Sequence, residues 1–443
     1  MRKPSANAPA AEPVADAELD GVFAIFAGLP KIALAVSGGP DSLALLHLAL
    51  AWRARLAAGR PDFIVLTVDH GLRAEARAEA EAVAKAASIL GVPAKILTRA
   101  APAAATAIQA DARADRYRLL KAAALEAGAQ ALATGHTIDD QAETLLMRLA
   151  RGSGVDGLAA MAPMSQLGEL LLLRPLLGLP KARLEASLRA RGIGWVTDPS
   201  NANPAFERPR LRAAMPTLEA AGLTAQAIAT SARRLARGRA ALEQITGEAA
   251  KRIVTIHDEG YFGIARAGFD ALPHDIRLRL LGRLIGRLGT PDQPERLARL
   301  ERLVGELVKE AHPTASLAGC LIKAGPDRIT VLREPGREGL PSLILAPGAS
   351  ADWDRRCHVA LSASAPDRVT IRALEEADFH AHIAAAARAS GLPRAVLLTC
   401  PSAWRGPDLI AMPVLGFLSP EVAFAPSLSL GGDRDCTGQF NSR

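Results

Sequence analysis

The sequence has few aromatic residues, few cysteines and no long hydrophobic run. Phe, Trp and Tyr make up 4% of the 443 residues, so alanine, leucine and valine must form most of the core. The four cysteines form no Cys-x-x-Cys pair; they are Cys320, Cys357, Cys400 and Cys436. This spacing argues against a zinc finger or an iron–sulfur site and is typical of a protein of the reducing cytosol.

No stretch is apolar enough to span a bilayer, and the first twenty residues lack the apolar core of a signal peptide. We therefore expect a cytoplasmic protein with no membrane segment, in which residues 1–22 form a flexible tail. The chain does have the composition of a packed protein, because 49% of its residues are hydrophobic and 22% are charged. Its length allows two to four domains.

Positive charge is concentrated in the middle of the chain. Lys and Arg outnumber Asp and Glu by 53 to 46 overall, which gives a net charge of +7. Between residues 207 and 310 there are 18 basic and 13 acidic residues, a net charge of +5. This excess favours an anionic partner for the middle segment.

Residues 31–200 alternate between strand-like and helix-like segments. Strands are expected at 31–36, 63–68, 94–97 and 131–134, and helices at 42–59, 74–90, 106–127 and 139–150. Nearly continuous apolar strands that alternate with helices form a parallel sheet covered on both faces. We therefore predict an α/β fold, with ligands bound beyond the carboxyl ends of the strands.

The pattern changes after residue 212. Helices are expected at 225–244 and 275–288, and a β-hairpin at 317–333. The chain is thus predicted to contain a parallel-sheet domain (23–212), a mostly helical, basic domain (213–335), a Pro/Gly-rich linker (336–349) and a small C-terminal α/β domain (350–443).

The strongest local motif lies between the first expected strand and its helix. It reads Ser37-Gly38-Gly39-Pro40-Asp41-Ser42. Two glycines allow the backbone to bend around phosphate oxygens, and free N–H groups at the start of a helix donate to an anion. The alternative is an ordinary strand–turn–helix junction in which Asp41 or Ser42 caps the helix. The motif is not a Walker P-loop, because it lacks the Gly-Lys-Ser/Thr ending.

Two further groups of residues accompany this loop. Asp69 and His70 end the second strand and are expected at the carboxyl edge of the sheet, near a base or ribose; a plain strand-ending turn is the alternative. Arg113 and Arg116 share a helix face with Tyr117, where cations can neutralise an α-phosphate. A solvated basic face is the alternative for these arginines.

The fourth motif begins at the end of the fourth strand. His136 precedes a helix whose first residues are rich in carboxylates. Asp139 and Glu143 share a face at a spacing of four, and Asp140 and Glu143 are neighbours at a spacing of three. Carboxylates beside a phosphate loop can bind Mg²⁺ or take a proton from an incoming ammonium. Acid-rich helix capping is the alternative.

Taken together and in order, these motifs resemble the PP-loop (N-type) ATP pyrophosphatase superfamily. With SGGPDS (37–42), VDHGLR (68–73), GHTIDDQAETLLMRLARGSGVDGLAAM (135–161), RPLL (174–177) and WVTDPSN (195–201), residues 31–212 closely resemble the tRNA(Ile)-lysidine synthase family. The remaining residues, 213–443, resemble its C-terminal domains only loosely.

The resemblance implies that ATP adenylates O2 of the wobble cytidine, position 34, in isoleucine tRNA with a CAU anticodon. The ε-amine of free lysine then attacks C2, so that AMP and pyrophosphate are released and lysidine is formed. Residues 23–212 are then the PP-loop catalytic domain, 213–335 a tRNA-binding domain and 350–443 a tRNA-recognition domain. The sequence leaves the oligomeric state open and is compatible with a homodimer.

The resemblance and the local chemistry together give an expected set of site residues. Catalysis is expected from Asp41, Asp140, Glu143, Arg113 and Arg116. ATP is expected to bind Ser37, Gly38, Gly39, Pro40, Asp41, Ser42, Asp69, His70 and His136, and Mg²⁺ to bind Asp41 and Asp139. Contacts to tRNA are expected from Arg208 and Arg212, and, on charge and a shared helix face alone, from Arg279, Arg283 and Arg287.

The sequence departs from the family motif at one position, and it leaves two alternative functions open. The family usually shows Arg-Asn-x-x-Arg, whereas this chain has Pro209 between Arg208 and Arg210, so a role carried by that asparagine is in doubt. A tRNA thiolase is one alternative, although such enzymes generally need cysteine near the ATP site and all four cysteines follow residue 319. A non-catalytic tRNA-binding protein is the other.

Overall fold

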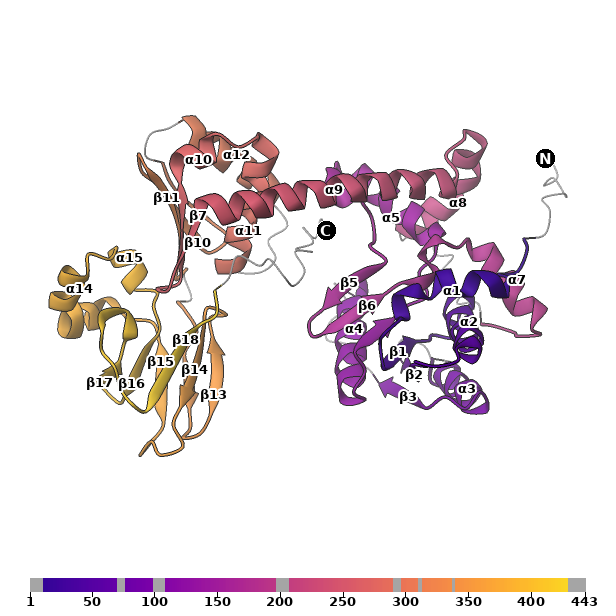
Figure 1. The fold of residues 1–443 in the computed structure, drawn as a ribbon, viewed down its shortest axis with the longest axis horizontal. Helices are drawn as coiled ribbons and strands as arrows, with labels where there is room; N and C mark the ends of the chain where they lie inside the picture. Colours follow the sequence, from indigo (N-terminus) through magenta and orange to yellow (C-terminus); the bar gives the residue numbers. More distant parts are fainter. Residues whose placement is uncertain are drawn as a thin grey trace. The chain divides into compact units, whose positions relative to one another are not determined.

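The computed structural model describes residues 11–69, 76–98, 108–196, 207–289, 296–309, 313–336 and 339–428, with the side chains of 108–113 and 296 outside that description. The chain forms two compact units, one reaching to Arg239 and the other beginning at Ala240. The boundary lies inside one long helix, α9 (Ala225–Ile253), and therefore later than the 212/213 boundary expected from the sequence (Figure 1).

The first unit is built on one six-stranded sheet with the strand order β3-β2-β1-β4-β6-β5. Its strands are β1 (Lys31–Ala35), β2 (Asp62–Asp69), β3 (Ala94–Thr98), β4 (Ala131–Ala133), β5 (Met164–Leu167) and β6 (Leu170–Leu173). Neighbouring strands are parallel except β5, which pairs antiparallel with β6. The expected parallel α/β fold and its four expected strands are confirmed, and the β5–β6 hairpin is an addition.

Helices cover both faces of this sheet. The helices of this unit that precede α9 are α1 (Leu19–Val22), α2 (Pro40–Arg55), α3 (Ala76–Ile89), α4 (Ile108–Glu126), α5 (Ile138–Ala150), α6 (Val155–Leu158), α7 (Lys181–Ala190) and α8 (Glu207–Ala220). Buried side chains of α2, α3 and α7 share one apolar cluster with β1, whereas those of α4 join a second cluster with β1 and β2. Along the chain, β1 is followed by α2 and β4 by α5, so both of these helices begin at the carboxyl edge of the sheet.

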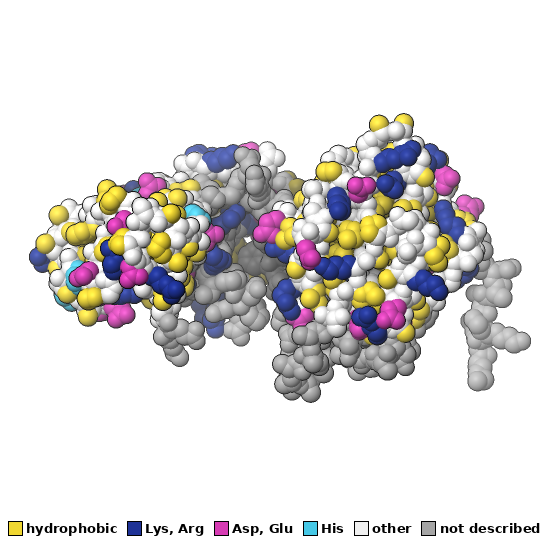
Figure 2. Space-filling view, turned by 90° about the horizontal axis from the view of Figure 1, so that it is seen from below, with side chains coloured by type: hydrophobic (Ala, Val, Ile, Leu, Met, Phe, Trp, Pro, Cys, Tyr) yellow, Lys and Arg dark blue, Asp and Glu magenta, His cyan; other side chains and the backbone are white. Residues whose placement is uncertain are grey.

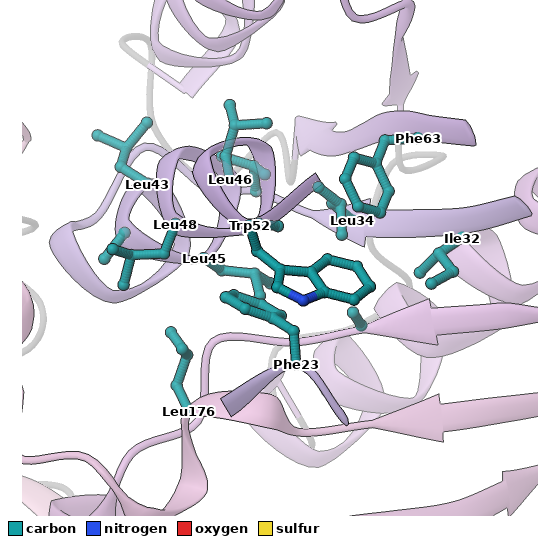
Figure 3. Packing of buried hydrophobic residues seen from close by; sticks show 14 of the residues in the cluster. Phe23, Ile32, Leu34, Leu43, Leu45, Leu46, Leu48, Trp52, Phe63 and Leu176 are labelled. Carbon is teal, nitrogen blue, oxygen red and sulfur yellow. The ribbon is translucent and has the colours of Figure 1, made fainter. Parts of the chain in front are cut away.

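The larger core cluster surrounds Trp52 of α2 (Figure 3). The Phe23 ring stacks on the indole with the two ring centres 5.6 Å apart, and the Phe26 ring meets it edge-on at 5.9 Å. Because aromatic pairs add about 0.5–1.5 kcal/mol beyond the area they bury, this cluster helps to fix α2, the helix whose first turn carries the end of the phosphate loop.

The segment before the first strand belongs to the same core. Val14 and Leu19 are buried, and the Val14 N–H donates to Ser187 Oγ of α7 at 2.8 Å. Glu18 forms an ion pair with Arg183 at 2.6 Å. The expectation of a flexible tail is therefore wrong for residues 11–22, because their few apolar side chains are enough to dock them on α2 and α7.

The second unit begins with a five-stranded antiparallel sheet in the order β7-β8-β11-β10-β9. Its strands are β7 (Val254–His257), β8 (Tyr261–Ala265), β9 (Thr314–Leu317), β10 (Cys320–Ala324) and β11 (Arg328–Arg333). Packed with it are the helices α10 (Arg266–Asp270), α11 (His274–Leu288) and α12 (Arg296–Lys309). The predicted hairpin and both predicted helices are confirmed, and the other three strands of the sheet are additions.

Two small sheets follow in the same unit. One has the order β12-β15-β16-β17, with β12 (Leu343–Leu345), β15 (Val369–Arg372), β16 (Ser402–Arg405) and β17 (Asp408–Ala411). The other joins β13 (Ser350–Trp353), β14 (Cys357–Leu361) and β18 (Val422–Pro426). The helical segments α13 (Glu376–Asp378), η5 (Phe379–Ile383), α14 (Ala384–Ser390) and α15 (Arg394–Leu397) accompany them.

The predicted linker is therefore only partly a connection. Residues 343–345 form β12, which pairs antiparallel with β15, so this part of 336–349 belongs to the C-terminal sheet. A three-residue strand among prolines and glycines is too short to give a pattern in the sequence. Across the described ranges, no helix combines the length and the apolar character needed to cross a membrane.

Candidate active site

The Ser37–Ser42 loop forms the turn between β1 and α2. Gly38 has φ +82°, in the left-handed region that favours glycine, and Pro40 occupies the first turn of the helix. The Ser37 N–H donates to Ser42 Oγ at 3.0 Å, and that hydroxyl donates to the Gly39 carbonyl at 3.0 Å. The loop is thus braced internally at the N-terminus of α2, where backbone N–H groups favour an anion.

The turn from β4 into α5 lies directly against this loop at Gly135. A side-chain carbon placed on Gly135 would lie 2.7 Å from the Asp41 carbonyl oxygen and 3.1 Å from the Ser42 nitrogen. Only glycine allows the two turns to approach so closely. Gly135 was not among the predicted site residues, although its place after a short strand in the fourth motif was visible in the sequence.

Asp41 lies at the start of α2 with most of its carboxyl group removed from solvent. Burial raises its pKa to about 6, with the charge of Lys181 opposing this shift and those of Asp140 and Asp139 adding to it. Lys181 Nζ lies 3.4 Å from Asp41 Oδ2. Within the described residues, the buried Oδ1 has no hydrogen-bond partner, so one carboxylate oxygen is free to bind a ligand.

Lys181 connects two of the predicted metal ligands. Its side chain reaches Asp41, and its backbone N–H, in the first turn of α7, donates to Asp139 Oδ2 at 2.8 Å. Asp139 thereby caps α7 while it occupies the first turn of α5. Lys181 was not predicted, because it follows Asp41 by 140 residues and no local pattern marks it.

Asp140 and Glu143 meet the same arginine. Arg212 of α8 bonds Glu143 through Nε and NH2 at 2.5 and 3.2 Å, and its NH2 lies 3.8 Å from Asp140 Oδ1. The Glu143 side chain is only 3% exposed, and burial raises its pKa although the hydrogen bonds and charge of Arg212 oppose the shift. Asp140 also caps its own helix by accepting the Thr137 N–H at 2.9 Å.

Two of the other predicted ATP contacts can be placed. Asp69 is buried at the carboxyl end of β2, as expected. His136 follows β4, and its Nδ1 lies 2.8 Å from Thr134 Oγ1, a contact that fixes the ring beside the turn. His70 lies outside the described residues.

The two arginines predicted to be catalytic, Arg113 and Arg116, both lie in α4. Arg113 lies in α4, but its side chain is outside the described part of the structure. Arg116 is exposed on the same helix, with its guanidinium carbon 5.8 Å from the centre of the Tyr117 ring. The catalytic roles of both stay predictions.

The chain enters α8 through Glu207, Arg208 and Pro209. Backbone N–H groups in the first turn of a helix have no partner within the helix, so the proline that replaces the family's asparagine is tolerated there. The charge of Arg208 opposes the rise that burial causes in the pKa of Glu143. Any hydrogen bonds made by an asparagine side chain at this position are lost.

The three arginines of α11 do not form the open face that their spacing suggested. Arg279 is buried and bonds Glu243 at 3.0 Å and Asp275 at 2.9 Å. Arg283 bonds Glu243 at 2.6 Å, with 12% of its side chain exposed. Of the three, Arg287 is the one exposed to solvent. Phosphate contacts by Arg279 and Arg283 would require these ion pairs to open.

The parallel sheet and the braced loop that leads from its central strand into α2 define a PP-loop ATP-binding domain. Residues 13–218 match the family model of that PP-loop domain. A tRNA(Ile)-lysidine synthase from Bradyrhizobium sp. (strain BTAi1) is 46% identical over 345 residues, which cover 73% of this chain and 96% of the relative. The chain belongs to the tRNA(Ile)-lysidine synthase family.

Two further proteins extend the comparison. The tRNA(Ile)-lysidine synthase of Ruegeria pomeroyi is 39% identical over 386 residues, which cover 87% of this chain and 89% of the relative. Among solved structures, a U34-tRNA thiolase from Methanococcus maripaludis covers 50% of this chain and 76% of its own at 17% identity, with a TM-score of 0.44. That likeness is too weak to support a thiolase function.

Proposed function

We propose that this protein ligates lysine to C2 of cytidine 34 in the CAU anticodon of isoleucine tRNA, with ATP as the energy source. One observation carries the proposal. The chain spans 96% of a lysidine synthase at 46% identity, and within it the phosphate loop, Asp41, Asp140 and Glu143 belong to two packed β–α turns. The homodimer stays a prediction.

The first step transfers AMP to the base. O2 of the cytidine attacks the α-phosphorus, and the bond between the α and β phosphates breaks to release pyrophosphate. The backbone N–H groups at the start of α2 donate to the phosphate oxygens, and the Ser42 hydroxyl holds the loop in place by accepting the Ser37 N–H and donating to the Gly39 carbonyl. The braced loop supplies these donors without reorganisation.

The residues present fit Mg²⁺ as the family implies it. Mg²⁺ prefers one or two carboxylates together with phosphate oxygens, and it would neutralise charge on the leaving pyrophosphate. Asp41 offers its buried oxygen Oδ1, which has no partner among the described residues, and Asp139 offers the oxygen that does not cap α7. Both aspartates are therefore proposed as ligands.

The second step forms the carbon–nitrogen bond. The ε-ammonium of lysine, with a pKa of about 10.4 in water, must lose a proton before it attacks C2 and displaces AMP. Asp140 and Glu143 are the proposed acceptors. Burial raises the pKa of Glu143 and so makes it a better base than an exposed carboxylate, while the hydrogen bonds and charge of Arg212 favour its ionised form.

The function is tested by mixing the full chain with ATP, Mg²⁺, labelled lysine and tRNA(Ile) bearing CAU. We expect lysine incorporation and AMP formation that depend on both the tRNA and free lysine, and pyrophosphate release that depends on the tRNA and continues beyond one turnover only with free lysine. A tRNA in which cytidine 34 is replaced by uridine is the matched control. Pyrophosphate release that needs a sulfur donor would favour a thiolase, and tRNA binding without pyrophosphate release would favour a non-catalytic protein.

Lysine 181 provides a pH test of the first step. Replacing Lys181 with methionine removes the positive charge that lowers the pKa of Asp41, so this pKa should rise above about 6. Asp41 then becomes protonated at a higher pH, and kcat/KM for ATP should begin to fall at a higher pH as the solution is acidified. The measurement is the pH profile of pyrophosphate release.

The matched control is Lys95→Met, which removes an exposed lysine paired with Glu126 on the same domain. In this control, kcat/KM for ATP should fall at the same acidic pH as in the wild type. A Lys181→Met profile with a lower plateau but an unshifted acidic limb would contradict the electrostatic role of Lys181.

A further inference from the structure

The molecule must present positive charge to the tRNA, and the arginines first expected to do so are largely paired. Arg279 and Arg283 both bond Glu243 within the second unit. Figure 2 shows one face of the molecule, on which Lys and Arg side chains are scattered among hydrophobic and neutral ones instead of forming one patch. A contiguous basic surface can instead lie on a single element.

The first half of α9 is such an element. Residues 225–239 contain four arginines and no Asp or Glu. Arg233, Arg234 and Arg237 are exposed. Arg233 NH2 lies 3.0 Å from the hydroxyl of Thr230, one turn earlier. No Asp or Glu of residues 225–239 balances the positive charge of this exposed face, whereas Glu243 and Asp275 pair with arginines of α11.

The opposite face of this first half of α9 packs against α5, the helix that carries Asp140 and Glu143. Ile228 and Ala232 are buried in one cluster with Ala142 and Leu145 of α5. At 100° per residue, Arg233, Arg234 and Arg237 lie on the side of α9 that faces away from this contact. Ala142 is the residue next to Glu143. The helix that carries the arginines therefore packs against the helix that carries Glu143.

We propose that Arg233, Arg234 and Arg237 form an RNA-backbone docking surface, defined by these three side chains, that binds phosphates of the tRNA substrate. Three guanidinium groups on one helix face, with no carboxylate among residues 225–239, suit the closely spaced phosphates of RNA. This inference rests on the proposed function and deepens it, because it names the surface that positions the substrate beside α5.

The test is a triple variant, Arg233→Gln, Arg234→Gln and Arg237→Gln, in the full chain. Affinity for tRNA(Ile) is measured across a range of NaCl concentrations. Each lost phosphate contact should reduce the slope of log K against log salt by about 0.7–0.9, so a total loss of about 2–3 is expected. At low salt the affinity should fall about 10- to 1000-fold, and KM for tRNA should rise while kcat is kept.

A matched control removes the same net charge elsewhere in the unit. Arg77, Arg118 and Arg189 are exposed arginines, each paired with a carboxylate of its own helix, and all three are replaced with glutamine. The proposal expects a near wild-type slope for this control. An equal loss of slope in both triple variants, or no loss in the α9 variant, overturns it. Thermal melting verifies that both variants are folded.

Failure of the proposal and failure of the proposed function give different results. If the wild type incorporates lysine and the α9 variant keeps the full salt slope, only the docking surface is wrong. If the α9 variant loses the expected slope but the wild type incorporates no lysine, the surface stands and the function is wrong. A wild type that does not bind tRNA overturns both.

Discussion

Replacing Gly135 with alanine should reduce tRNA-dependent pyrophosphate release by about 100-fold or more. The added carbon would lie 2.7 Å from the Asp41 carbonyl oxygen and 2.9 Å from the carbonyl carbon, closer than such atoms approach in proteins. Because both neighbours are backbone atoms, the turn after β4 must move away from the phosphate loop. A displacement of about 1 Å in catalytic groups is enough to lower a rate by about 100-fold.

The measurement is kcat for pyrophosphate release at saturating tRNA, with Gly154→Ala as the control. Gly154 precedes α6 at φ −78°, and an added carbon there meets nothing within 4 Å. The two variants therefore add the same atoms in different surroundings. Binding of tRNA should be retained in both, since α9 is untouched. A Gly135→Ala protein with the wild-type kcat would show that the two turns need not pack closely.

The phosphate loop was predictable because its signal is local. Two glycines, a proline and two serines lie within six residues at a strand–helix junction, and each has a conformational or hydrogen-bonding reason to be there. The alternation of strands and helices gave the parallel sheet for the same reason. The carboxylates of α5 were also predictable, since their spacing on one helix is a sequence property.

The partners of these carboxylates were not predictable. Lys181 follows Asp41 by 140 residues, and Arg212 follows Glu143 by 69. The fold alone brings them together, and a lysine or arginine in an amphipathic helix looks the same in sequence whether it is solvated or paired. Arg279 and Arg283 show the converse, because Glu243 of α9 pairs with both.

Arg212→Ala should have its largest effect on the second step of the reaction. Without Arg212, the buried Glu143 loses its hydrogen-bonded cation, and its pKa, already raised by burial, should rise further. A protonated Glu143 cannot accept a proton from lysine, so lysine incorporation at neutral pH should fall by about 100-fold, within the range of general-base effects. Pyrophosphate release should fall less.

The same substitution should destabilise the fold in a pH-dependent manner. Breaking a fully buried ion pair destabilises a protein by about 3–5 kcal/mol, and the 41% exposure of the Arg212 side chain reduces the expected loss to about 1–2 kcal/mol. A carboxyl group whose pKa is raised by folding favours the folded state at low pH, and this advantage is lost as the pH rises through the folded-state pKa. The deficit of Arg212→Ala should therefore be largest at pH values above the raised folded-state pKa of Glu143 and should shrink as the pH falls below it.

Chemical unfolding of both proteins at a series of pH values measures this change. In a single turnover, with enzyme in excess over tRNA, the ratio of lysine incorporated to pyrophosphate released measures the step affected. Arg210→Ala removes an exposed arginine of the same helix and is the matched control for both. A deficit that is constant with pH would mean that Arg212 contributes packing and not charge. Equal losses of both products would mean that Arg212 acts in adenylation. A role confined to Glu143 and lysine would lower lysine incorporation more than pyrophosphate release.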